Sequence, residues 1–139
     1  MRRGGWRRSV IVVDLSAVVA ILFGEASAGS LLARLAADPD PVMSVASYLE
    51  TGTAPARRRR SDRLRAIDDL DAFLDEAGIA LAPIDATQAR LALQARIQFG
   101  RGMGHGGVLS FGDAFSYALA RIHEAHPCCS RATISALPM

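Results

Sequence analysis

The order of apolar and polar residues along the chain predicts strands that alternate with helices. Three short apolar runs are typical of buried strands, at residues 10–14, 42–46 and 79–84. The segments between and after these runs have the features of helices, at residues 16–23, 27–38, 47–51, 62–77, 85–100 and 111–125. Strands separated by helices favour an α/β fold, here a three-layer α/β/α sandwich with a mostly parallel central sheet.

Local signals mark where some of these helices begin and end. Asp85 and Gln88 have the spacing of a capping box, and Gly100 closes the same helix. Either Ser44 or Ser47 is positioned to cap the helix that holds the sequence SYLET. These signals set the expected bounds of two helices.

The composition is that of one globular domain. The chain has 139 residues, half of them apolar, and no apolar run approaches the roughly 20 residues that cross a bilayer. The leader MRRGGWRRS is basic, but the run after it has no small-residue cleavage site. The cysteines Cys128 and Cys129 are adjacent and cannot form a disulfide framework. We therefore expect a cytoplasmic protein without a membrane segment.

Three carboxylates lie next to apolar residues near the ends of predicted elements. Asp14 ends the first strand, Glu50 lies within SVASYLET, and Asp113 opens the last apolar helix. Each has an ordinary interpretation: Asp14 and Asp113 can cap helices, and Glu50 can be a solvated helix residue. In α/β folds, however, ligands bind outside the carboxyl ends of the strands. The combination of the three therefore indicates a candidate site.

Carboxylates that converge need either a proton on one of them or a hard cation among them. A set of oxygen ligands favours Mg²⁺ or Mn²⁺, and the usual chemistry of such a site is phosphodiester hydrolysis by an activated water. The histidines are scattered, and we interpret His105, in a glycine-rich loop, as a solvated loop residue. That loop is not a Walker A motif, because it lacks the lysine and the hydroxyl residue after it.

Three blocks of the sequence resemble those of PIN-domain ribonucleases: VIVVDLSAVVAILFGE, MSVASYLET and GGVLSFGDAFSYALA. The third block is the most specific, since its Gly-Asp pair opens a helix rich in Phe, Tyr and Ala. The resemblance runs from about Val10 to about Glu124. It is closest to the VapC type, the toxin of a type II toxin–antitoxin pair.

The resemblance implies a Mg²⁺-dependent endoribonuclease, with Mn²⁺ as an alternative cation. It implies that Asp14, Glu50 and Asp113 are the first three acids of the family's metal site and its catalytic residues. Asp14 and Asp113 are expected to hold the metal, Glu50 to orient the water, and Ser16 to supply a nearby hydroxyl. It further implies an RNA substrate, a homodimer, and a small VapB-like antitoxin that fills the acidic groove.

The end of the chain departs from this family. Where the family has a strand and a turn with a fourth acid, in a form like PLLFKGDDF, this chain has HPCCSRATISALPM and no acid after Glu124. Permitted synonymous codons for this tail, read one base earlier, spell PLLFKGDDFSATD. We therefore expect a frameshifted C-terminus with a degraded last strand. The expected organisation is a basic leader at 1–9, a PIN-like domain at 10–126 and an atypical tail at 127–139.

Two other departures concern the middle of the chain. Pro55 is expected to shorten or kink the helix that carries Glu50. The arginine run at 57–60 is interpreted as a solvated helix start, with contact to RNA or antitoxin as the alternative. Two functions stay open: an active endoribonuclease toxin, or a catalytically impaired remnant that binds an antitoxin without cleaving RNA.

Overall fold

Four short strands form one parallel sheet in the computed structural model, which describes residues 10–37, 40–104, 106–123 and 127–128. The strands have the spatial order β3-β2-β1-β4 and are β1 (Val12–Val13), β2 (Val42–Ser44), β3 (Ala80–Ala82) and β4 (Pro127–Cys128). All three strand pairings are parallel. The carboxyl ends of the strands therefore meet at one edge of the sheet, with β1 between β2 and β4.

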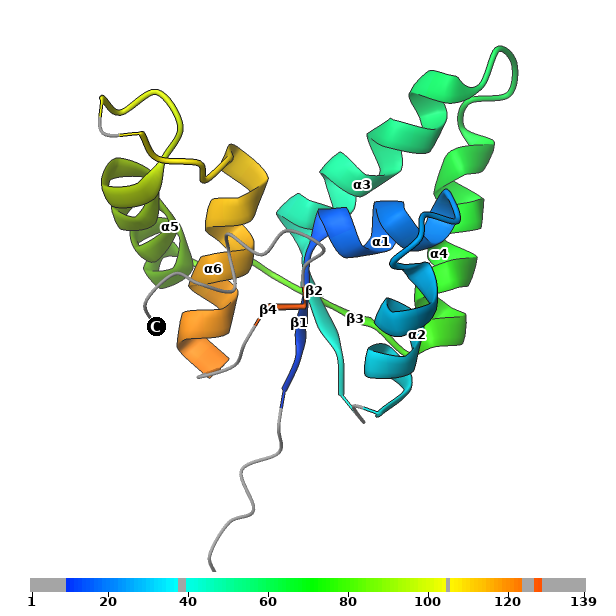
Figure 1. Ribbon diagram of the computed structural model, residues 1–139, viewed down its shortest axis with the longest axis horizontal. Coiled ribbons are helices and arrows are strands. Elements are labelled where there is room, and N and C mark those ends of the chain that lie inside the picture. The colour runs from blue at the N-terminus through cyan, green and yellow to red at the C-terminus, as the bar shows by residue number, and fades with distance from the viewer. Residues whose placement is uncertain (1–9, 38–39, 105, 124–126, 129–139) are drawn as a thin grey trace, which may run out of the picture.

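Helices cover both faces of this sheet (Figure 1). The pair α5 and α6 lies on one side, and α1, α2 and α4 lie on the other, while α3 packs against both α4 and α6. The helices are α1 (Leu15–Leu22), α2 (Ala28–Ala37), α3 (Val45–Arg58), α4 (Arg65–Ala77), α5 (Ala86–Phe99) and α6 (Phe111–His123). The predicted three-layer α/β/α sandwich with a parallel sheet is confirmed.

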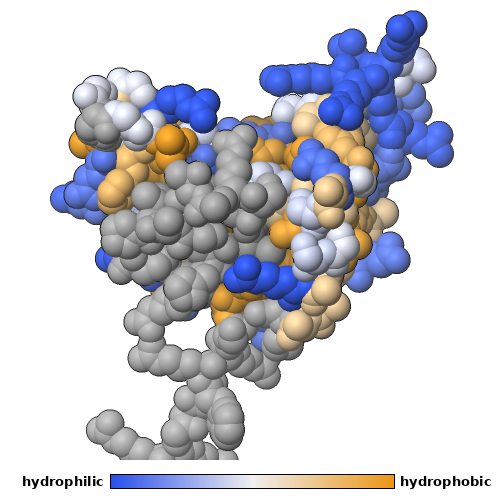
Figure 2. Space-filling view, viewed as in Figure 1, coloured by the Kyte–Doolittle hydropathy of each residue, from blue (hydrophilic) through white to orange (hydrophobic). Residues whose placement is uncertain are grey.

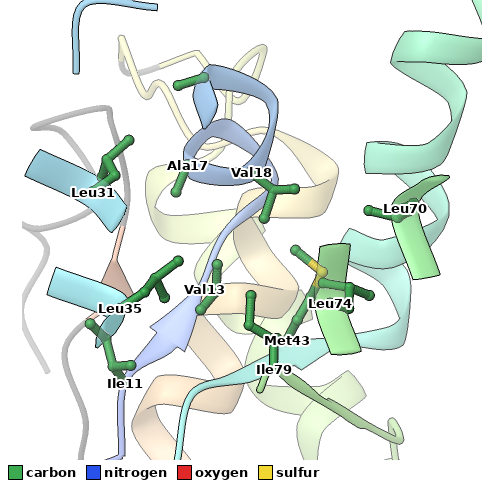
Figure 3. Packing of buried hydrophobic residues seen from close by; sticks show 11 residues of the cluster. Ile11, Val13, Ala17, Val18, Leu31, Leu35, Met43, Leu70, Leu74 and Ile79 are labelled. Carbon is green, nitrogen blue, oxygen red and sulfur yellow. The ribbon is translucent and has the colours of Figure 1, made fainter. Parts of the chain in front are cut away.

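The side chains of β1 alternate between the two faces of the sheet. Val13 belongs to the larger core cluster, where it meets Met43 and the buried leucines of α2 and α4 (Figure 3). Val12 belongs to a second cluster with Leu119 and Ala120 of α6. Both faces of the strand are thus buried, which explains why the sequence here is a continuous apolar run rather than an alternating one.

Side-chain caps fix two helices close to where the sequence predicted them. Ser44 caps α3, because its Oγ accepts a hydrogen bond from the backbone N–H two residues later at 3.3 Å. Ser47, the other candidate, is instead buried on α3. Asp85 caps α5 and accepts from Gln88 N at 2.8 Å, while the side chain of Gln88 donates to Pro83 O at 3.0 Å.

Pro55 was expected to shorten or kink its helix, and the shortening is wrong, because α3 continues through Pro55 to Arg58. A proline inside a helix removes one backbone hydrogen bond. The residues on both sides of Pro55 nevertheless stay helical. The interpretation of the arginine run as a helix start is also wrong. Arg57 and Arg58 form the last turn of α3, and Arg59 is its C-cap. Positive charge at a helix C-terminus complements the helix dipole, and Figure 2 shows hydrophilic residues gathered over this end of α3.

The described part of the tail is β4, whose two residues pair with the two residues of β1. The basic leader at 1–9, His105, and residues 129–139, where the frameshift hypothesis mainly falls, lie outside the described residues. Within the described ranges, no helix is long and apolar enough to cross a membrane.

Candidate active site

Asp14 lies at the carboxyl end of β1 and is fully buried. It is the N-cap of α1, with an extended backbone at φ −92° and ψ 157°. Its Oδ2 accepts a hydrogen bond from Ser16 Oγ at 3.0 Å and lies 3.5 Å from Ser16 N. The carboxylate therefore caps a helix and also lies at the edge of the sheet where α/β folds bind ligands.

Asp113 lies in the first turn of α6 and is 3% exposed. It forms a reciprocal pair with Ser110: Ser110 N donates to Asp113 Oδ2 at 3.0 Å, and Asp113 N donates to Ser110 Oγ at 3.3 Å. This is the geometry of a capping box, in which each side chain satisfies a backbone N–H of the other residue. The start of α6 thus fixes the position of the Asp113 carboxylate.

Glu50 lies on α3, half-buried, where α3 meets the start of α6. A Cβ atom on Gly112 would lie 2.0 Å from Glu50 Oε2, a distance that no real side chain allows. Glycine at this position therefore lets the carboxylate of Glu50 approach the backbone of α6. In the Gly-Asp pair of the third sequence block, Gly112 makes room for the Glu50 carboxylate, and Asp113 is itself one of the three candidate acids.

The electrostatics of Glu50 join the three acids into one neighbourhood. The pKa of Glu50 is raised above its ordinary value, first by desolvation and then by the negative charges of Asp113 and Asp14. These two charges come from α6 and from the junction of β1 with α1. Both aspartates therefore act electrostatically on Glu50, although all three acids are far apart in the sequence.

A metal fits this set of side chains in its chemistry, because the donors are carboxylate and hydroxyl oxygens and their like charges need an offset. Within the described residues, however, no group of three or more His, Cys, Asp or Glu side chains is arranged ready to hold an ion. Asp14, Glu50 and Asp113 thus offer the right donors near one another without forming a closed cage.

Sequence reasoning missed two residues of this site, Ser47 and Ser116. Ser116 Oγ donates to Asp14 Oδ1 at 2.6 Å, and Ser47 Oγ lies 3.1 Å from Ser116 Oγ. Both serines are fully buried. The available signal was their position, since each serine is three residues from a candidate acid and so lies on the same face of its helix.

Comparison with known proteins assigns the chain to a family. The model of the PIN domain matches residues 11–126. The chain therefore belongs to the PIN-domain family.

Within that family the chain is of the VapC type. It is 43% identical over 112 residues to Ribonuclease VapC42 of Mycobacterium tuberculosis, covering 81% of this chain and 83% of that protein. It is also 43% identical over 112 residues to Ribonuclease VapC of Mycolicibacterium smegmatis, covering 81% of this chain and 84% of that protein.

Solved structures share the fold at lower sequence identity. The crystal structure of VapC20 of Mycobacterium tuberculosis, a sarcin-ricin loop cleaving toxin, matches with a TM-score of 0.70 and 22% identity, covering 91% of this chain and 93% of that one. A toxin–antitoxin complex from Klebsiella pneumoniae matches with a TM-score of 0.62 and 15% identity, covering 84% of this chain and 82% of that one.

Proposed function

We propose that this chain is a divalent-metal-dependent endoribonuclease that acts as the toxin of a type II toxin–antitoxin pair. The observation that carries this proposal is the neighbourhood of Asp14, Glu50 and Asp113, contributed by three separate elements at the carboxyl edge of the sheet. The names of the VapC relatives, which are ribonucleases, support RNA as the substrate.

In the proposed site each acid has its own task. Asp14 and Asp113, fixed by hydrogen bonds at the starts of α1 and α6, hold the cation. Glu50, whose pKa is raised by its surroundings, orients the attacking water and accepts its proton, for which a raised pKa is favourable. Ser16 holds Oδ2 of Asp14 in place.

The cation is Mg²⁺, with Mn²⁺ as an alternative, because an all-oxygen donor set suits both ions. When bound, it supplies positive charge for the phosphate and lowers the pKa of a water molecule. In its absence the protein must carry three carboxylates whose charges repel one another.

Two apolar hollows on the surface support the proposal that the chain binds other proteins. One, of about 310 Å³, lies between α5 and α6 and is lined by residues that include the exposed side chains of Leu93, Ile97 and Phe111. The other, of about 280 Å³, lies between α3 and α4 and includes the exposed Leu49 and Leu64. We propose that the chain forms a homodimer and binds a VapB-like antitoxin in the cytoplasm, and that these hollows contribute contact surface.

Cleavage of RNA by the purified chain tests this proposal. We expect Mg²⁺-dependent cleavage that stops when EDTA is added and that is lost in Asp113→Asn. Asp75→Asn, a change of an exposed aspartate on α4, is the matched control and should leave the rate unchanged. Cleavage that persists in EDTA, or equal rates for parent and Asp113→Asn, would contradict the proposal.

A second function is favoured by the sequence of the tail, which has no acid after Glu124. In this alternative the chain is a catalytically impaired PIN-domain remnant that still binds an antitoxin. Tight binding of a VapB-like peptide, with no cleavage of any RNA in Mg²⁺ or Mn²⁺, would favour the remnant over the active toxin.

A further inference from the structure

Two buried serines link the helices that carry Glu50 and Asp113. Ser47 on α3 and Ser116 on α6 are both fully buried, and their Oγ atoms lie 3.1 Å apart. Ser47 is three residues before Glu50, and Ser116 is three residues after Asp113, which is the spacing that puts two side chains on one face of a helix. The serine contact therefore lies one helical turn from the acids, between the same two helices.

The direction of the hydrogen bonds follows from the number of hydrogens. An ionised carboxylate only accepts, so the single hydroxyl hydrogen of Ser116 is used in its 2.6 Å bond to Asp14 Oδ1. Ser116 can then only accept from Ser47, which makes Ser47 the donor in that pair. The bonds run from Ser47 to Ser116 to Asp14, and such a chain strengthens its charged last bond.

We propose that Ser116, supported by Ser47, is a positioning residue that fixes the Asp14 carboxylate for cation binding. Ser116 holds Oδ1 from the side of α6, and Ser16 holds Oδ2 from the side of α1. Donors on both oxygens oppose rotation of the carboxylate group. The inference rests on the proposed function only in assigning a cation to Asp14, because the hydrogen bonds exist without it.

The affinity of the full-length chain for Mn²⁺ alone, measured by electron paramagnetic resonance without RNA, tests this role. Ser116→Ala should weaken Mn²⁺ binding by about 10–100-fold, the usual effect of removing a group that orients a metal ligand. Ser47→Ala should weaken it less, because the bond from Ser116 to Asp14 remains. Ser116→Thr keeps the hydroxyl and should bind Mn²⁺ more tightly than Ser116→Ala.

The matched control is Ser30→Ala, which removes an exposed hydroxyl that donates to Ser27 O near the start of α2. It should leave Mn²⁺ affinity unchanged. Equal Mn²⁺ affinity in Ser116→Ala and the parent would overturn the proposal, as would equal losses in Ser116→Ala and Ser116→Thr.

A measurement that needs no metal makes the inference independent of the proposed function. In EDTA, we expect the effects of Ser116→Ala and Asp14→Asn on the unfolding equilibrium constant to be non-additive by about tenfold, because Ser116→Ala removes the donor of this hydrogen bond and Asp14→Asn removes the negative charge of its acceptor. Additive effects would overturn the positioning role. If the parent neither binds Mn²⁺ nor cleaves RNA, the proposed function fails, and this double-mutant cycle still decides whether Ser116 holds Asp14.

Discussion

At the scale of single residues, Asp14 combines two roles that the sequence presents as alternatives. Its Oδ2 takes part in the cap of α1 through Ser16, and its Oδ1 accepts from Ser116. A carboxylate has two oxygens and about four lone-pair sites, so one side chain can accept bonds from two helices at once. Capping α1 is therefore compatible with the metal-binding role that we propose for Asp14.

Glu50 gives a prediction about stability and pH. Folding raises the pKa of Glu50. The folded protein therefore keeps the carboxyl proton of Glu50 in a pH range where the unfolded chain has lost that proton. Well below the ordinary pKa of 4.5 the residue is neutral in both the folded and the unfolded state. As the pH rises from there through the raised value, the ionised carboxylate increasingly destabilises the metal-free fold.

Glu50→Gln should therefore have a higher melting temperature than the parent at pH 7 in EDTA. The difference should shrink as the pH falls and disappear well below 4.5, where Glu50 is neutral in both the folded and the unfolded chain. In excess Mg²⁺ the order should reverse, because only the parent keeps the full set of acids. Thermal unfolding across pH with and without Mg²⁺ checks this, and a pH-independent difference would show that the charge of Glu50 is not its cause.

At the scale of elements, the site depends on how closely α3 approaches α6. Gly112 is buried at the start of α6, against the carboxylate of Glu50. Gly112→Ala should displace Glu50 and weaken Mn²⁺ binding by about tenfold or more, because a Cβ atom would overlap Glu50 Oε2. Titration with Mn²⁺ measures this loss.

Gly29 supplies the matched control, because it is likewise the second residue of a helix, α2. A Cβ atom there would meet nothing within 4 Å. Gly29→Ala should leave Mn²⁺ binding unchanged and stabilise the fold by about 0.4–1 kcal/mol. Equal Mn²⁺ affinities for Gly112→Ala and Gly29→Ala would show that the close approach of α6 to Glu50 does not matter.

Prediction from sequence succeeded where the signal is local. The cap at Asp85 and the strand that leads to Asp14 depend on neighbouring residues, and both were identified. The prediction that the arginine run starts a helix was wrong, because α3 continues through Pro55 and ends within that run. The effect of a proline on a helix depends on the packing around it, which the local sequence does not give. The role of Ser116 could not be predicted either, since its contact with Asp14 joins residues 102 positions apart.

At the scale of the whole molecule, the tail of the chain pairs with the sheet beside β1. The sequence predicted a degraded last strand, but Pro127 and Cys128 pair with Val12 and Val13. A parallel strand bonds through its backbone, so the two residues that this tail supplies can still pair with β1. What the tail lacks is an acid, since the sequence has none after Glu124.

We therefore expect the chain to bind Mg²⁺ weakly and to cleave RNA slowly. A variant with the tail PLLFKGDDFSATD in place of residues 127–139 should gain affinity for Mg²⁺ and cleave RNA at least about tenfold faster, because an added carboxylate strengthens an oxygen-donor site. The rates of the two chains are compared at saturating Mg²⁺ and at lower concentrations. Equal cleavage by both chains would show that a fourth acid is not needed and that the tail at residues 127–139 has no functional cost.

The most direct test of the central claim, that the three acids form a metal site, is calorimetric titration of Mg²⁺ into Asp14→Asn. Asparagine caps helices as well as aspartate does, so the fold should be retained. Asp85→Asn is the matched control, because Asp85 is also a helix N-cap aspartate. We expect the parent and Asp85→Asn to bind Mg²⁺ alike and Asp14→Asn to bind it at least about tenfold more weakly. Equal Mg²⁺ affinity in all three proteins would mean that Asp14 is only a helix cap.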